Sequence, residues 1–220
     1  MPGATQIVFA AQFLSSDSVR GKRVLDVGSR NYNGSIKPLV MHYNPQEYIG
    51  IDVTPGRGVD LTLSATQITE HFGERSFDII ICLEMLEHTA DWRTAVLSMK
   101  KALRPGGRLI LTTRSVGYPC HHFPHDYWRF SVDDLEAIFS EFNELLTQRD
   151  PHLPGAFVTG RCPEIVLSPP QRAVHCFLTD SRELTLPTTL HRKRRFLKLR
   201  LRELLKKVGQ SIRRFAPSPY

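Results

Sequence analysis

Carboxylates and glycines follow short apolar runs in the first half of the chain. The run Val24-Leu25-Asp26-Val27-Gly28 is typical of a buried strand that ends on a glycine, and Gly34 follows within one loop. An apolar strand that leads into a glycine turn and then a helix predicts a nucleotide-binding crevice, because glycine lets the backbone approach the ligand. Asp26 is costly to bury among apolar neighbours unless a cation or a hydrogen-bond donor satisfies it. It is therefore the first candidate for a binding role.

Three further apolar runs end on, or lead directly into, polar residues. They cover residues 48–53, 77–83 and 109–113, and the polar residues are Asp52, Glu84 and Arg114. The carboxyl ends of parallel strands meet at one edge of a sheet, where such sheets bind their ligands. We therefore expect one edge to gather these side chains together with Asp26 and Gly28.

Segments with helical spacing separate the apolar runs. They cover residues 5–18, 34–43, 68–72, 91–103 and a helix that Ser131 caps. This alternation predicts the α/β fold class, with a Rossmann-like, seven-stranded, mostly parallel sheet that carries helices on both faces. Weaker runs near 143–149 and 156–161 are expected to form an antiparallel hairpin at one edge of the sheet.

Positive charge is concentrated at the C-terminal end of the chain. Residues 181–220 carry twelve Lys and Arg against two Glu, and the formal charge of the whole chain is +7, so residues 1–180 carry −3. We divide the chain into a domain over 1–165, a Pro-containing linker with little structure over 166–189, and a basic amphipathic helix over 190–220. Such a helix could make peripheral contact with an anionic membrane through residues 190–215, bind a phosphate backbone, or dock on a protein surface.

The remaining composition places few restrictions on the chain. No apolar run reaches membrane-spanning length, and the N-terminus lacks the basic start of a signal peptide. The four cysteines show no C-x-x-C pairing, so we expect no disulfide framework. A cytoplasmic protein follows from these features, and the basic tail could bring it to the inner membrane face.

Four motifs in order resemble those of the class I S-adenosylmethionine-dependent methyltransferases, over roughly residues 20–140. The residues are Val24-Leu25-Asp26-Val27-Gly28, then Asp52, then Phe77 to Cys82 with Glu87-His88, then Leu103 to Leu109. The segment His125-Asp126-Tyr127-Trp128-Arg129-Phe130 also resembles one found in small bacterial members, which often accompany enzymes of surface-polysaccharide synthesis. One motif alone would be weak, whereas four in the right order make the resemblance specific.

The resemblance implies S-adenosyl-L-methionine as the cofactor and assigns residues to its parts. Asp26 would face the methionyl ammonium, and Asp52 would accept hydrogen bonds from the ribose hydroxyls. The cofactor-binding set implied in this way is Asp26, Gly28, Ser29, Arg30, Gly34, Asp52, Val53, Leu83 and Glu84. Two positions depart from the family pattern: Arg30 stands where a second glycine is usual, and Ser64-Ala65 stand where many members carry an acid near the adenine.

Methyl transfer to a hydroxyl also needs a base, because the hydroxyl proton must leave. We rank His125 first, since it lies in the loop that follows the fifth strand, with Tyr127 and His122 as further candidates and His88, His121 and Glu84 behind them. Histidines and Cys120 crowd this loop, which raises the question of a metal site. No second ligand pair stands at a matching distance, so no metal is expected.

The sequence favours an enzyme that methylates a hydroxyl of a sugar, a glycan or another small metabolite. Two alternatives stay open. One is an RNA methyltransferase that uses the basic tail, and the other is a cofactor-binding partner subunit without catalysis. A nicotinamide dehydrogenase is the weakest reading, since G-x-G-x-x-G is absent after the first strand.

Overall fold

A computed structural model of the chain describes residues 3–121, 125–165 and 169–187. Its helices are α1 (Ala4–Ala11), α2 (Ser16–Val19), α3 (Lys37–His42), α4 (Ile68–Phe72), α5 (Trp92–Ala102) and α6 (Val132–Ile138), with 3-10 turns η1 (Ala65–Gln67) and η2 (Leu86–His88). Its strands are β1 (Arg23–Val27), β2 (Glu47–Asp52), β3 (Leu61–Thr62), β4 (Phe77–Leu83), β5 (Leu103–Arg114), β6 (Trp128–Arg129), β7 (Asn143–Arg149), β8 (Gly155–Arg161), β9 (Val174–Cys176) and β10 (Ser181–Glu183).

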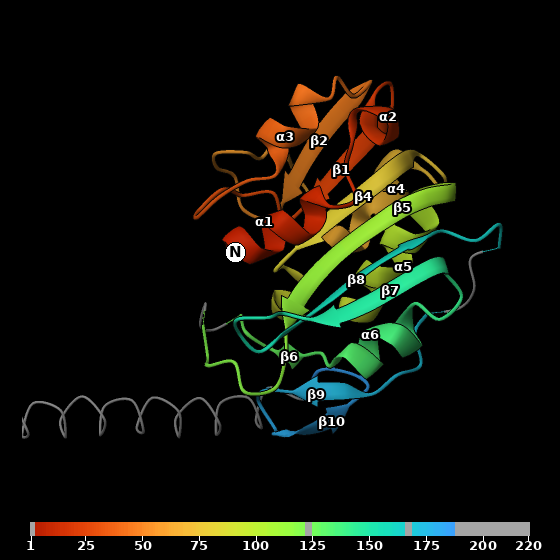
Figure 1. Cartoon of the computed structure of the whole chain (residues 1–220). Helices are drawn as coiled ribbons and strands as arrows, with labels where there is room; N and C mark the ends of the chain where they lie inside the picture. The colour runs from red at the N-terminus through yellow and green to blue at the C-terminus, as the bar shows by residue number, and fades with distance from the viewer. Residues whose placement is uncertain (1–2, 122–124, 166–168, 188–220) are drawn as a thin grey trace, which may run out of the picture.

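Seven strands form the main sheet in the order β3-β2-β1-β4-β5-β8-β7. The pairs from β3 to β5 are parallel, and β8 runs antiparallel to both of its neighbours. This confirms the predicted mostly parallel sheet with an antiparallel hairpin at one edge. Figure 1 shows α1 across one face of the sheet and α4 and α5 on the other.

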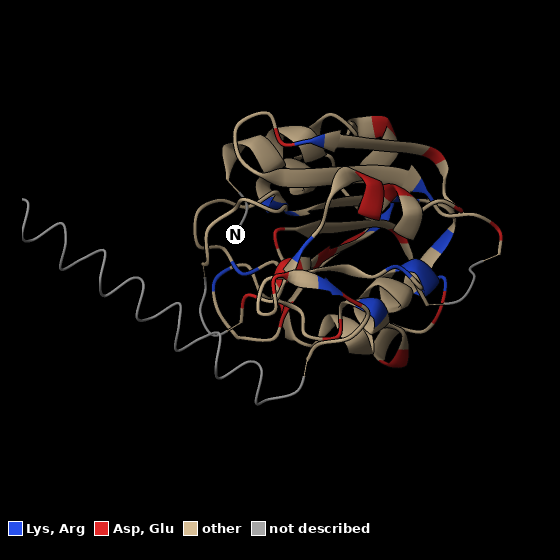
Figure 2. Ribbon diagram, turned by 90° about the horizontal axis from the view of Figure 1, so that it is seen from below, with Lys and Arg blue, Asp and Glu red and all other residues tan. Residues whose placement is uncertain are grey.

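Alternate residues of the central strands pack on opposite faces, so the core has two parts. Ile80 and Cys82 of β4 belong to the larger cluster, under α4, α5 and α6, while Ile79 and Ile81 belong to the smaller one, under α1 and α3. This period of two is what a strand buried on both faces requires. Acidic and basic residues are interspersed along the described ribbon (Figure 2).

Several predicted boundaries differ from those observed. The helix predicted over 5–18 is two helices, because Ser15 caps α2 by accepting a hydrogen bond from the Ser18 amide. The helix predicted over 34–43 begins only at Lys37, with a proline in its first turn. The predicted cap of α6 is confirmed as a full capping box between Ser131 and Asp134.

The prediction that 166–189 has little structure is wrong for the residues described there. Strands β9 and β10 form a second sheet with β6, and Val174, Cys176 and Leu178 are buried in the larger core cluster. Their runs are three residues long, which is too short for a periodic signal. The predicted basic helix over 190–220 lies outside the described residues. Among those described, no helix combines the length and apolar character needed to cross a bilayer.

Because Leu178 is buried, this second sheet should add to the stability of the domain. We expect Leu178→Ala to lower the free energy of unfolding by about 2–4 kcal/mol. The matched control Leu184→Ala removes a side chain that is 44% exposed, and it should change stability by under about 0.5 kcal/mol. Urea unfolding followed by circular dichroism measures both, and equal effects of the two substitutions would contradict the packing described here.

Candidate active site

A cavity of about 620 Å³ opens at the carboxyl ends of β1, β2 and β4. This is the edge at which the sequence places its polar residues, and the strand order reverses direction there between β1 and β4. The predicted site residues that line the cavity are Gly28, Arg30, Asp52, Val53, Glu84, His125 and Tyr127. Four other predicted residues, Asp26, Ser29, Gly34 and Leu83, are not among the lining residues, and His122 lies outside the described residues.

The turn after β1 needs glycine for a reason that the sequence did not reveal. Gly28 has a φ of +81°, and a Cβ built on it would lie 2.7 Å from the Cβ of Met85. The amides of Gly28 and Ser29 both donate to the Ile51 carbonyl, at 2.8 and 3.0 Å. These amides are already used within the fold, so the turn does not offer them as a phosphate cradle.

Arg30, which replaces the usual second glycine, packs within its own loop. Its guanidinium lies 4.5 Å from the ring centre of Tyr32, and a Cβ built on Gly56 would lie 2.7 Å from its Nε. Both Arg30 and Tyr32 line the cavity. The bulkier loop therefore forms one wall of the cavity and does not fill it.

Asp52 ends β2 with its carboxylate at the cavity wall. Its Oδ1 accepts a hydrogen bond of 2.8 Å from the Thr54 amide, and Oδ2 accepts none from the residues that the structure describes. The next side chain, Val53, is 70% exposed and also lines the cavity. An oriented carboxylate beside an exposed apolar side chain is suited to a sugar diol that carries a flat ring.

Asp26 lies beneath the cavity in β1, and its partner comes from the neighbouring strand. The Tyr48 hydroxyl donates to Asp26 Oδ2 at 2.5 Å. Burial raises the pKa of Asp26 from 3.8 to about 6, against the lowering effects of the Tyr48 hydrogen bond and of Lys37. The cost of burying Asp26 is therefore only partly offset inside the protein.

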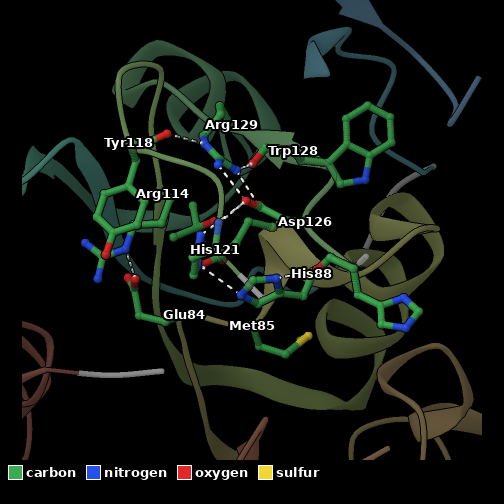
Figure 3. Close-up of polar contacts among 12 residues, drawn as sticks. Glu84, Met85, His88, Arg114, Tyr118, His121, Asp126, Trp128 and Arg129 are labelled. Atoms are coloured by element: carbon green, nitrogen blue, oxygen red, sulfur yellow. Dashed lines mark hydrogen bonds and ion pairs between the residues drawn. The ribbon is translucent and has the colours of Figure 1, made fainter. Parts of the chain in front are cut away.

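Glu84 follows β4 with a left-handed backbone, at φ +58°. This conformation is uncommon for a residue with a side chain and is frequent at functional sites. Its carboxylate forms a buried ion pair with Arg114, which also lies 3.5 Å from Asp150 Oδ2. Gln6 of α1 donates to the same Asp150 oxygen at 2.9 Å. The chain of contacts from Glu84 thus reaches the first helix through Arg114 and Asp150 (Figure 3 shows the Glu84–Arg114 pair).

A second buried carboxylate, Glu87, lies next to His88 and His121, which line the cavity. Glu87 is fully buried, and its Oε1 lies 3.8 Å from His88 Nε2 and 3.7 Å from His121 Nε2. Burial works to raise the pKa of Glu87, but its interactions with His121 and His88 bring it to about 2. Burial works to lower the pKa of His121, but Asp126 and Glu87 raise it to about 9.

The loop that carries these groups is held by the segment that the sequence singled out. Asp126 and Arg129 form a fully buried ion pair, Trp128 donates from its indole to the Thr89 carbonyl at 3.0 Å, and Phe130 packs in the core. His125 Nδ1 lies 2.8 Å from the Tyr127 hydroxyl. Both of these side chains line the cavity, whereas Trp128 and Phe130 do not.

Sequence reasoning missed several lining residues. Met85, Thr89, Ala90 and Asp91 follow Glu84 along the connection from β4 to α5. Their position directly after a strand that ends at the ligand edge was the available signal. Thr54 carried the same signal after β2, whereas Tyr32 did not, because it reaches the cavity from an irregular loop.

Comparison with known proteins identifies the fold and its family. A family model described as a methyltransferase domain matches residues 7–149. The chain belongs to the class I S-adenosylmethionine-dependent methyltransferases. The resemblance expected from the four sequence motifs is thereby confirmed.

Curated relatives of this methyltransferase match over a limited stretch. The ubiquinone biosynthesis O-methyltransferase of Idiomarina loihiensis is 32% identical over 111 residues, which cover 44% of this chain and 44% of the relative. The enzyme of the same name from Aromatoleum aromaticum is 30% identical over 118 residues, covering 47% and 48%. The chain thus spans under half the length of these relatives.

Solved structures share the fold of this methyltransferase at low sequence identity. The 1,6-didemethyltoxoflavin-N1-methyltransferase of Burkholderia thailandensis, solved with S-adenosylhomocysteine, has a TM-score of 0.57 at 18% identity over 72% of this chain and 76% of its own. The [4+2]-cyclase SpnF has a TM-score of 0.54 at 17% identity, over 74% and 84%. Because a cyclase shares the fold, the reaction must be argued from the site.

The cavity of this chain fits a cationic cofactor. Its acidic lining residues are Asp52, Glu84 and Asp91, and apart from histidines its basic lining residue is Arg30. S-adenosylmethionine carries a sulfonium and an ammonium, whereas a dinucleotide needs donors for its phosphates.

The raised pKa of Asp26 makes a prediction about stability. Because the folded-state pKa of about 6 exceeds 3.8, the contribution of this carboxyl is fully present below pH 3.8 and is lost as the pH rises through 6. Asp26→Asn should therefore raise the free energy of unfolding at pH 8 by up to about 3 kcal/mol, with little gain at pH 4.

Urea unfolding at the two pH values measures this difference. Asp133→Asn, at an exposed position of α6, is the control and should show no such pH dependence. An Asp26→Asn protein that loses stability equally at pH 4 and pH 8 would show that the carboxylate is satisfied when ionised.

Proposed function

We propose that this protein is an S-adenosylmethionine-dependent O-methyltransferase that acts on a hydroxyl group of a small molecule. The observation that carries the proposal is the acidic cavity at the switch point of the sheet, with Asp52 at the end of β2 and Glu84 after β4. The names of the curated relatives support oxygen as the methyl acceptor.

The chain's own residues would position the two reactants. Bound S-adenosylmethionine would supply an electrophilic methyl group. Asp52 would orient the ribose, and the Glu84–Arg114 pair would fix the amino-acid end next to Gly28. Orientation of this kind supplies much of the acceleration in a displacement reaction with a good leaving group.

A hydroxyl acceptor must lose its proton, and His125 with Tyr127 is the pair we assign to that step. The two side chains share a hydrogen bond of 2.8 Å and both reach the cavity. The imidazole would take the proton of the acceptor hydroxyl, directly or through the Tyr127 oxygen. His122 remains a proposal from the sequence alone.

The class of acceptor is the less constrained part of the proposal. The sequence favoured a sugar or glycan, partly on the aromatic residues of the 125–130 segment. Of these, Tyr127 lines the cavity, while Trp128 and Phe130 are fully buried in the core. Of these aromatic side chains, Tyr127 can therefore contact the ring of a sugar acceptor. A phenolic acceptor would suit the site at least as well as a sugar.

Cofactor binding is tested by calorimetric titration with S-adenosylhomocysteine. The intact protein should bind with a micromolar Kd, and Asp52→Ala should weaken binding at least about 100-fold, because two charge-assisted hydrogen bonds are worth about 3 kcal/mol or more. The exposed Asp133→Ala is the control and should bind like the intact protein. Absence of binding to the intact protein would refute the proposal.

The base assignment is tested by turnover with S-adenosylmethionine labelled in its methyl group. Catechols and glycosides serve as two arms of an acceptor panel. On whichever arm is methylated, His125→Ala should lower kcat by about 10²–10⁴-fold and leave S-adenosylhomocysteine affinity unchanged. His152→Ala, in the turn between β7 and β8, is the control. Full turnover by His125→Ala would show that another group accepts the proton.

A further inference from the structure

Three potential ligand atoms converge beside the cavity, from two separate segments. Glu87 and His88 lie in η2, directly after β4, and His121 lies in the loop after β5. Oε1 of Glu87 is 3.8 Å from Nε2 of His88 and 3.7 Å from Nε2 of His121, and one ligand atom from each residue lies within 4.8 Å of the others. Figure 3 shows His88 and His121 next to one another, with Asp126 beyond His121.

Hydrogen bonds hold the remaining polar atoms of His88 and Glu87, and an ion pair with Asp126 orients His121. The His125 carbonyl lies 2.5 Å from His88 Nδ1, and because a carbonyl only accepts, this nitrogen carries the hydrogen and Nε2 keeps the lone pair. Asp126 Oδ2 lies 3.3 Å from His121 Nδ1. Thr113 donates to Glu87 Oε2 at 2.8 Å. Outer hydrogen bonds of this kind orient the ligands of protein metal sites.

Two of the three converging atoms have no hydrogen-bond partner among the described residues. Oε1 of Glu87 and Nε2 of His121 are buried without a hydrogen-bond partner in the part of the chain that the structure describes. Glu87 is fully buried, so an unpartnered carboxylate oxygen there is costly and calls for an explanation.

We propose that Glu87, His88 and His121 bind a divalent transition-metal ion of the zinc type. Two imidazoles and one carboxylate form the ligand set of several zinc sites, and bonds of about 2.0–2.2 Å in a tetrahedron place ligand atoms ~3.4 Å apart. The observed 3.7 and 3.8 Å need a small inward shift. Magnesium and calcium prefer oxygen ligands and are less suited to this set.

Such a site would keep a coordination position open toward the cavity. His88 and His121 line the cavity together with His125 and Tyr127. An oxygen of the acceptor could occupy the open position, a role that rests on the proposed methyltransferase function. Metal binding itself does not depend on that function, so the two can be tested separately.

The test is calorimetric titration of the full chain, prepared without a histidine tag and stripped with EDTA, with zinc chloride. One ion should bind per chain with a Kd of about 1 µM or tighter. His121→Ala should weaken binding about 100-fold, and Thr113→Val, which removes only the outer hydrogen bond to Glu87, about 10-fold. His42→Ala, at an exposed position of α3, should bind like the intact protein. Cobalt(II) should give the intense visible absorption of a four-coordinate site.

Each outcome distinguishes this inference from the proposed function. Weak or absent zinc binding by the intact protein, or unchanged affinity in a folded His121→Ala, would overturn the metal site and leave Glu87, His121 and Asp126 as an ion-pair network. Thr113→Val provides the same comparison if His121→Ala does not fold. If the protein binds S-adenosylhomocysteine but not zinc, only the metal site is refuted. If it binds zinc but not S-adenosylhomocysteine, only the proposed function is refuted.

Discussion

The buried ion pair between Asp126 and Arg129 holds together the parts of this protein that meet at the cavity. Two hydrogen bonds of 2.5 and 2.8 Å join the side chains, and neither is exposed by more than 1%. Arg129 also donates to the carbonyls of Tyr118 and Pro119, and it stacks on Phe177 at 4.4 Å. Loss of either partner would leave an uncompensated buried charge, at a cost of about 3–5 kcal/mol.

The location of this pair explains how an irregular loop can present chemical groups accurately. Asp126 accepts a hydrogen bond of 2.8 Å from the His121 backbone amide, which joins the two described parts of the loop. Trp128 bonds to the Thr89 carbonyl and so ties the loop to the connection after β4. The two walls of the cavity, one from each connection, are thereby attached to each other. Second-sheet strands β9 and β10 complete the support, since β9 pairs with β6 beside Arg129.

Much of the fold could be predicted from the sequence because the patterns that indicate its strands are local. The apolar runs gave the strands, and the polar residues at their ends gave the edge of the sheet, so Asp52 and Glu84 could be named from position alone. The rest depends on contacts between residues distant in sequence. Tyr48 donates a hydrogen bond to Asp26 from the neighbouring strand, and Met85 occupies the space beside Gly28. The three-residue strands β9 and β10 are defined by their pairing with each other and with β6, so no local pattern marks them.

The contacts from Gln6 through Asp150 and Arg114 to Glu84 connect the first described helix to the amino-acid end of the cavity. Gln6 is almost fully buried, although it lies near the start of the chain. A ligand that stabilises the Glu84–Arg114 arrangement therefore also holds α1 on the sheet, and linkage makes this effect reciprocal. Fraying of α1 and dissociation of the ligand are then coupled equilibria. The protection of the α1 amides from hydrogen exchange therefore reports whether the cavity is occupied, although no residue of α1 lines it.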